Sequence, residues 1–137
     1  MARVIAVTNQ KGGVGKTTTS INVAYFLSKM GKRTLIIDFD PQGNATSGLG
    51  IDKQELGATM TEVIMRQTRL AKVVLPTEYK DLYLAPSTSH LANTEVELAQ
   101  ADARFARLRE ALNGVIDYDY IIIDSPPSLS LLTVNGL

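Results

Sequence analysis

Residues 11–17 read Lys-Gly-Gly-Val-Gly-Lys-Thr and closely follow the apolar run Val4-Ile5-Ala6-Val7. This order predicts a short buried strand, a glycine-rich turn and then a helix that begins near Lys16. Backbone N–H groups in such a turn point inward, and the helix N-terminus adds partial positive charge, so the turn can seat phosphate groups. The glycines permit a close backbone approach that a Cβ would obstruct. The stretch therefore predicts a phosphate-binding loop; a Gly-rich turn with a purely structural role is the alternative.

The loop departs from the general pattern G-x-x-x-x-G-K-[ST] at one position. Gln10 stands where the first glycine belongs, and a second lysine, Lys11, precedes the glycine pair. In such a loop Lys16 reaches the β- and γ-phosphates and the Thr17 hydroxyl binds Mg²⁺. The predicted nucleotide-binding residues form one stretch: Lys11, Gly12, Gly13, Val14, Gly15, Lys16, Thr17 and Thr18.

Composition limits the class of protein. The chain has 137 residues, 45% of them hydrophobic and 20% charged, which fits one globular domain with one core. Its formal net charge is zero, so no overall field attracts it to nucleic acid or anionic lipid. Cysteine is absent, which excludes disulfides, thiolate zinc sites and cysteine-ligated iron–sulfur clusters within this chain. We expect no membrane span and no signal peptide, and hence a cytoplasmic location.

Apolar runs and helical patterns alternate along the chain. We expect strands at residues 3–8, 33–37, 73–75, 81–85 and 120–123, and helices at 17–30, 61–69, 94–100 and 104–113. The alternation predicts an α/β fold in which helices cover both faces of an open, mostly parallel sheet. The first strand contains the continuous apolar run Val4 to Val7, so we expect it to be covered on both faces. Ligands of such sheets bind beyond the carboxyl ends of the strands.

Asp124 ends the most apolar of the expected strands, Tyr120 to Ile123, and precedes Ser-Pro-Pro-Ser. In a chain that already has a phosphate loop, an aspartate at this place is expected to hold Mg²⁺, as a Walker B residue does. The alternative is a cap of the following turn. The tandem Pro126-Pro127 stiffens the loop after it, which is suited to sensing a γ-phosphate.

Asp38 and Asp40 flank Phe39 at the end of the second expected strand, so both carboxylates can face one side. Two carboxylates near a triphosphate are suited to orienting the attacking water or supporting the Mg²⁺ shell, with Asp38 as a possible metal ligand. The alternative for Asp40 is turn formation with Pro41.

Three segments together closely resemble the ParA family: Lys11 to Thr18, Asp38 to Thr46 (Asp-Phe-Asp-Pro-Gln-Gly-Asn-Ala-Thr) and Tyr120 to Ser128. ParA proteins are deviant-Walker ATPases of chromosome and plasmid partitioning, and Soj-type proteins are the nearest group. The related MinD proteins share the first and third segments, whereas the second is distinctly ParA-like. The resemblance covers essentially all of residues 1–137, as the N-terminal part of one P-loop NTPase domain.

The resemblance implies an ATP-operated dimer switch with ATP and Mg²⁺ as cofactors. Lys11 matches the signature lysine that reaches the partner's nucleotide across the dimer, and Lys16 matches the P-loop lysine. Thr17 and Asp124 match the Mg²⁺ ligands, and Asp40 matches the aspartate that orients the hydrolytic water. The catalytic residues implied are thus Lys11, Lys16 and Asp40. A ParB-type partner is expected to stimulate hydrolysis, and the ATP dimer to bind DNA without sequence preference, which places the protein at the nucleoid.

Length is the departure from the family pattern. Members of the family continue past the position of Leu137 with further strands and helices, which carry most adenine contacts and the DNA-binding residues. We therefore expect an N-terminal fragment or a truncated product. Two alternatives to the partitioning ATPase remain open: a nucleotide-binding module with little turnover, and a MinD-like membrane-cycling ATPase, which needs a C-terminal amphipathic helix. We expect the basic clusters at 66–72 and 104–109 to be solvated helix faces.

Overall fold

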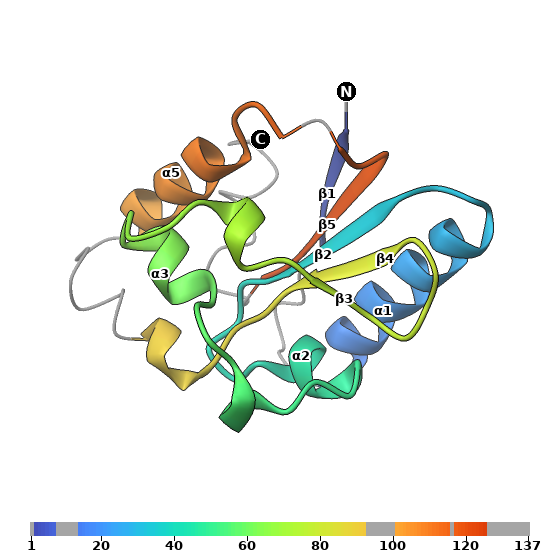
Figure 1. Ribbon diagram of the computed structural model, residues 1–137, viewed down its shortest axis with the longest axis horizontal. Coiled ribbons are helices and arrows are strands. Elements are labelled where there is room, and N and C mark those ends of the chain that lie inside the picture. Colours follow the sequence, from blue (N-terminus) through green and yellow to red (C-terminus); the bar gives the residue numbers. More distant parts are fainter. Residues whose placement is uncertain (1, 8–13, 93–100, 116, 126–137) are drawn as a thin grey trace.

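The computed structural model describes residues 2–7, 14–92, 101–115 and 117–125 (Figure 1). The strands in these ranges are β1 (Arg3–Val7), β2 (Thr34–Asp38), β3 (Leu75–Pro76), β4 (Leu82–Ala85) and β5 (Tyr120–Asp124). The helices are α1 (Val14–Lys29), α2 (Asn44–Gly48), α3 (Met60–Ile64) and α5 (Ala101–Leu112), with short 3₁₀ helices at Lys53–Glu55, Leu70–Lys72 and Ser89–Ala92. The predicted helix at 94–100 and the Pro126-Pro127 loop lie outside the described residues.

The strands form one sheet in the order β1-β5-β2-β4-β3. All neighbouring pairs are parallel except β3 with β4, where Leu75 and Pro76 pair antiparallel to Leu84 and Tyr83. A proline is tolerated there because β3 is an edge strand and needs no further ladder partner on its outer side. The predicted open, mostly parallel α/β sheet is confirmed.

The last described strand, β5, lies between β1 and β2. It pairs with β1 from Arg3↔Tyr120 to Val7↔Asp124, and with β2 from Thr34↔Tyr120 to Asp38↔Asp124. The register therefore brings the carboxyl ends of three strands level with one another. Asp124 and Asp38 become neighbours at that end, although 86 positions separate them in the chain.

Side-chain alternation along the central strands divides the core into two layers. On one face, Ile36 and Ile122 pack with Ala24 of α1 and Ala45 of α2. On the other face, the buried residues from the strands, α3 and α5 include Leu35, Ile37, Ile121, Ile123, Met60, Val63, Ile64 and Leu108. Each fully buried aliphatic side chain of this kind stabilises the fold by about 1.5–3 kcal/mol. Figure 1 shows α1 and α2 on one side of the sheet and α3 and α5 on the other.

Two predicted features differ from the structure. The expectation that β1 is covered on both faces is wrong, since Arg3 is exposed and Ile5 is 40% exposed. Arg3 and Ile5 lie on the same face of β1, whereas Val4 and Ala6, on the opposite face, pack against the core layer of α3 and α5. The helix predicted at 61–69 is shorter, and a capping box between Thr59 and Glu62 starts it one residue earlier. It ends because Arg66 adopts a left-handed backbone (φ 61).

In the described part of the chain, no helix combines the length and the apolar character that a bilayer crossing requires.

Candidate functional site at the carboxyl end of the sheet

Asp124 ends β5 and is fully buried, and two hydroxyl groups of α1 donate to it. Thr17 Oγ1 donates to Oδ2 and Ser20 Oγ donates to Oδ1, each at 3.1 Å. Thr17 and Ser20 are three residues apart, so they share the face of α1 that packs against the sheet. The predicted meeting of the first helical turn with the end of the Tyr-Ile-Ile-Ile-Asp strand is therefore present.

Asp38 lies beside Asp124 at the end of β2 and is also fully buried. Its Oδ2 accepts hydrogen bonds from the Thr46 N–H at 2.9 Å and the Thr46 hydroxyl at 2.7 Å, and its Oδ1 accepts the Asp40 N–H at 3.3 Å. Burial raises the pKa of the Asp38 carboxyl to about 6; the Asp124 charge acts in the same direction, and the bonds from Thr46 oppose it. Both oxygens of Asp38 already have donors within the protein.

Asp40 is half-buried and starts the turn that the Asp-Pro pair suggested. Its Oδ1 accepts the Gln42 N–H at 3.0 Å, and its carbonyl accepts the Gly43 N–H at 2.8 Å. The same carbonyl accepts the Ser87 hydroxyl at 2.8 Å, which ties the turn to the end of β4. The turn role of Asp40 is thus observed, and it places the carboxylate two residues beyond Asp38 at the same end of the sheet.

The described residues include only part of the phosphate loop. Lys11, Gly12 and Gly13 lie outside them, and the side chains of Val14 and Lys16 are likewise not described. The backbone of Val14, Gly15 and Lys16 forms the first turn of α1, so the helix begins two residues before the predicted start near Lys16. Thr17 is buried and Thr18 is exposed. The N-terminus of a 16-residue helix therefore follows the loop and faces the carboxyl end of the sheet.

A divalent cation fits the donor set that Thr17 and Asp124 supply. A hydroxyl and a carboxylate oxygen are hard ligands of the kind Mg²⁺ prefers, and Mg²⁺ at nucleotide sites takes few protein ligands besides phosphates and water. The observation that tests the fit is the hydrogen bond between the two groups, which places their oxygens 3.1 Å apart, close enough for both to face one ion. Among the described residues, no group of three or more His, Cys, Asp and Glu side chains lies close enough together to hold a metal ion.

A protein-family model described as an AAA domain matches residues 2–137, which is nearly the whole chain. The chain belongs to this AAA-domain family. The resemblance to ParA and Soj proteins is confirmed by curated relatives. The sporulation initiation inhibitor protein Soj of Bacillus subtilis and the chromosome partitioning protein ParA of Myxococcus xanthus are each 49% identical over 138 residues and match all of this chain.

The matches extend over only part of those relatives. The chain covers 54% of the Soj protein and 49% of the ParA protein, so it spans about half their length. A solved structure of cobyrinic acid a,c-diamide synthase from Mycobacterium smegmatis, with bound ATP analogue and magnesium, is 40% identical with a TM-score of 0.86. The structural match extends over all of this chain and over 56% of the synthase chain. These neighbours confirm the P-loop NTPase fold.

Within this AAA-domain site, sequence reasoning did not single out three hydroxyl residues. Ser20 lies one turn after Thr17 on α1 and also donates to Asp124. Its spacing of three residues from Thr17 was the sequence signal that could have identified it. Thr46 was noted only as the last residue of the ParA-like segment, and Ser87 was not noted. No local pattern marks these two, because their partners lie 8 and 41 positions away and meet only in the folded sheet.

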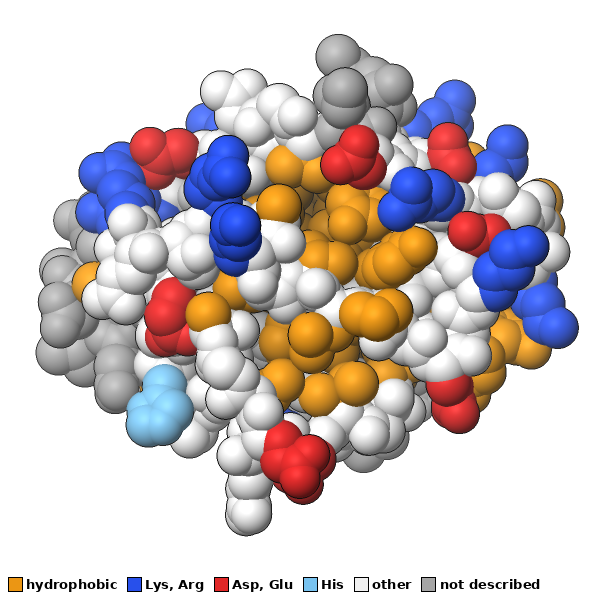
Figure 2. Space-filling view, viewed as in Figure 1, with side chains coloured by type: hydrophobic (Ala, Val, Ile, Leu, Met, Phe, Trp, Pro, Cys, Tyr) orange, Lys and Arg blue, Asp and Glu red, His pale blue; other side chains and the backbone are white. Residues whose placement is uncertain are grey.

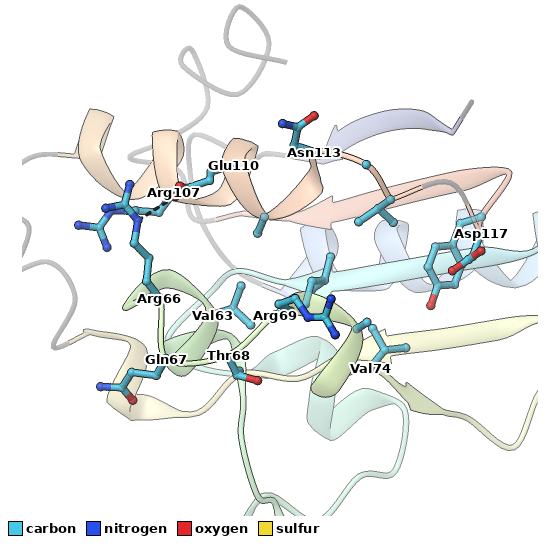
Figure 3. Close-up of a pocket in the computed structure, with 16 residues that line it drawn as sticks. Val63, Arg66, Gln67, Thr68, Arg69, Val74, Arg107, Glu110, Asn113 and Asp117 are labelled. Atoms are coloured by element: carbon cyan, nitrogen blue, oxygen red, sulfur yellow. Dashed lines mark hydrogen bonds and ion pairs between the residues drawn. The ribbon is translucent and has the colours of Figure 1, made fainter.

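Of the two basic clusters at 66–72 and 104–109, Arg66, Arg69 and Arg107 line a groove of about 680 Å³ between α3 and α5 (Figure 3). Arg66 Nε lies 2.9 Å from Glu110 Oε2, and Arg107 donates to the Ile64 carbonyl at 2.9 Å. Arg66 is exposed, as expected, but Arg107 is half-buried and fastens α5 to the end of α3. The groove is thus lined by helix-to-helix contacts. Figure 2 shows that positive and negative side chains alternate around a hydrophobic centre on the face in view.

Proposed function

We propose that the protein is an ATP-binding and ATP-hydrolysing switch of chromosome or plasmid partitioning. The observation that carries the proposal is the contact of Thr17 with Asp124, because it joins the first turn of α1 to the end of β5 as a Mg²⁺-nucleotide site requires. Relatives named Soj and ParA, at 49% identity, supply the biological process. The solved neighbour with ATP analogue and magnesium supports ATP and Mg²⁺ as cofactors.

Each site residue has a distinct role in this proposal. Thr17 and Asp124 would hold Mg²⁺, which supplies charge neutralisation at the β- and γ-phosphates when bound. Lys16 and the N–H groups of the 11–18 loop would bind the phosphates, and Asp40 would orient the attacking water. Asp38 remains a possible Mg²⁺ ligand beside Asp124, and its oxygens accept hydrogen bonds from Thr46 and Asp40, which belong to the segment after β2.

Lys11 carries the dimer part of the proposal. A lysine supplied by one protomer to the nucleotide of the other would neutralise phosphate charge only in the dimer, so ATP binding and assembly become thermodynamically linked. A ParB-type partner would then act by stimulating hydrolysis. Non-specific DNA binding is proposed for the complete protein, through regions outside this chain, with the nucleoid in the cytoplasm as its location.

The test separates binding from turnover in the complete protein. Mg-ATP affinity and phosphate release are measured independently, with and without DNA. The switch predicts both activities; binding without release favours the nucleotide-binding module. Lys11→Ala is expected to bind ATP and stay monomeric, as followed by sedimentation velocity. ATP-dependent dimerisation that survives Lys11→Ala would contradict its role across the dimer.

A further inference from the structure

A closed chain of hydrogen bonds fixes the segment that carries Asp40. Thr46 donates to Asp38 Oδ2 through both its N–H, at 2.9 Å, and its hydroxyl, at 2.7 Å. The Thr46 hydroxyl oxygen in turn accepts the Ser87 N–H at 3.1 Å. The Ser87 hydroxyl then donates to the Asp40 carbonyl at 2.8 Å, and the Asp40 N–H returns to Asp38 Oδ1 at 3.3 Å.

Three of the four members of this hydrogen-bond relay are buried and the fourth, Asp40, is half-buried, so the three buried groups depend on their hydrogen bonds within the protein. Asp38, Thr46 and Ser87 have no exposed surface. A buried polar group that loses its partner keeps the full cost of leaving water, and a fully satisfied network holds one geometry. The Thr46 hydroxyl is the central element, because it donates to a carboxylate and accepts from an N–H at the same time. Valine has the same shape and can do neither.

The turn after Asp40 is also packed tightly against the end of β4. Gly43 has φ 64, and a Cβ at this position would lie 2.9 Å from the Ser87 carbonyl oxygen and 2.9 Å from Lys53 Nζ. Lys53 Nζ itself donates to the Gln42 carbonyl at 2.8 Å. The ends of β2 and β4 therefore hold the Asp40 turn by contact as well as by hydrogen bonds.

We propose that Thr46 and Ser87 are positioning residues for hydrolysis, which act by holding the Asp40 turn at the carboxyl end of the sheet. This inference rests on the proposed role of Asp40 in orienting water. Neither residue needs to touch the nucleotide, since in the described part of the chain the two side chains hydrogen-bond to Asp38, to the Asp40 and Thr88 carbonyls, and to the Ser87 N–H. Loss of the relay should therefore lower turnover and leave the affinity for Mg-ATP nearly unchanged.

The experiment uses Thr46→Val, Thr46→Ser and Ser87→Ala in the complete protein, with Ser47→Ala as the control. Ser47 is exposed and lies next to Thr46 on α2. We expect phosphate release to fall about ten- to a hundredfold in Thr46→Val and Ser87→Ala, since a misplaced orienting group costs this much. Thr46→Ser should restore most of the rate, because it keeps the hydroxyl, and Mg-ATP affinity should change less than about twofold. Unchanged release, an equal loss of affinity, or a Thr46→Ser variant as slow as Thr46→Val would overturn the proposal.

A second readout separates the relay from the proposed function. Amide hydrogen exchange of Ser87 and Asp40, measured without nucleotide, should accelerate about tenfold or more in Thr46→Val, because the Ser87 N–H loses its acceptor. If the unsubstituted protein releases no phosphate, the proposed function fails, and the exchange data still decide whether the relay exists. If Thr46→Val does not fold, Ser87→Ala decides, since it leaves Thr46 intact and removes the 2.8 Å bond to the Asp40 carbonyl together with the longer 3.4 Å bond to the Thr88 carbonyl. Unchanged exchange at Asp40 in a folded Ser87→Ala would refute the relay.

Discussion

Asp38 is a buried carboxyl group whose proton links the stability of the fold to pH. Its pKa rises from 3.8 to about 6, chiefly because burial disfavours the charged form. Between these two pKa values the native state binds more protons than the unfolded state, so the free energy of unfolding falls as pH rises. Above about pH 6 both states are deprotonated at Asp38, and its contribution becomes constant.

The resulting prediction concerns the slope of stability against pH. In magnesium-free buffer, the free energy of unfolding measured with urea should decline as the pH rises from about 4 to about 6. The full decline across this interval should be on the order of 3 kcal/mol. Asp38→Asn should flatten this part of the profile, because the amide does not titrate. An unaltered slope in Asp38→Asn would assign the effect to other groups.

Thr61 differs from Asp38 because its buried side-chain hydroxyl lacks a compensating hydrogen bond in the described part of the chain. Its Oγ1 is buried and has no hydrogen-bond partner in the described part of the chain. Thr61→Val preserves the shape and removes the cost of burying an unpaired hydroxyl, so we expect stability to stay the same or rise by up to about 1 kcal/mol. Thermal or chemical unfolding measures this. A loss of more than about 1 kcal/mol would show that Thr61 has a polar partner.

Sequence reasoning reached the acidic residues of the site but not the hydroxyls that hold them. Asp38, Asp40 and Asp124 each end an apolar run, and a strand end is visible in a single sequence. Thr46 reaches Asp38 because α2 folds back over the end of β2, and Ser87 reaches Asp40 because β2 and β4 are neighbours. Pairing between strands is a property of the whole sheet, and no local pattern encodes it.

At the scale of elements, the helices and strands were predictable where apolar periodicity is strong. The strand at 120–123 and the helix at 17–30 were expected within a few residues of β5 and α1. The position of β5 between β1 and β2 was not predicted, since the order of strands in the sequence does not show their order in the sheet. The end of α3 was also missed, because Arg66 takes a left-handed conformation that glycine usually supplies.

Gly31 and Gly43 both have a left-handed backbone, so substituting each by alanine gives a pair of stability predictions that can be compared. Gly31 follows α1 with φ 81 and has open space where a Cβ would stand, whereas Gly43 has φ 64 and would meet Ser87 O and Lys53 Nζ. Gly31→Ala should cost about 1 kcal/mol from backbone strain alone. Gly43→Ala should cost roughly 1–3 kcal/mol more, because the turn must also move away from β4.

Chemical unfolding of both variants, compared with the unsubstituted chain, measures the difference. The control is built into the pair, as both substitutions add the same methyl group at a left-handed position. Equal losses in the two variants would mean that the Asp40 turn is not held against the end of β4.

At the scale of the whole molecule, one end of the sheet brings together the described segments that we assign to the proposed nucleotide site. The first turn of α1, the ends of β2 and β5, and the turn after Asp38 come from segments spread over more than 100 residues. Parallel pairing places these ends side by side, which is why open α/β sheets bind ligands there. The chain spans about half the length of its curated relatives, so activity, dimerisation and DNA binding are proposed for the complete protein.

The central claim is that Thr17 and Asp124 make a Mg²⁺-dependent ATP site. The most direct test is titration calorimetry of ATP binding to the complete protein, in Mg²⁺ and in EDTA, for the unsubstituted chain and for Asp124→Asn. Asp117→Asn serves as the control, since Asp117 is exposed and lies before β5, at the other end of that strand. The account predicts that Mg²⁺ tightens ATP binding in the unsubstituted and control proteins, and that Asp124→Asn loses about tenfold or more of this gain. An Asp124→Asn variant that keeps the full Mg²⁺ effect on ATP affinity would contradict it.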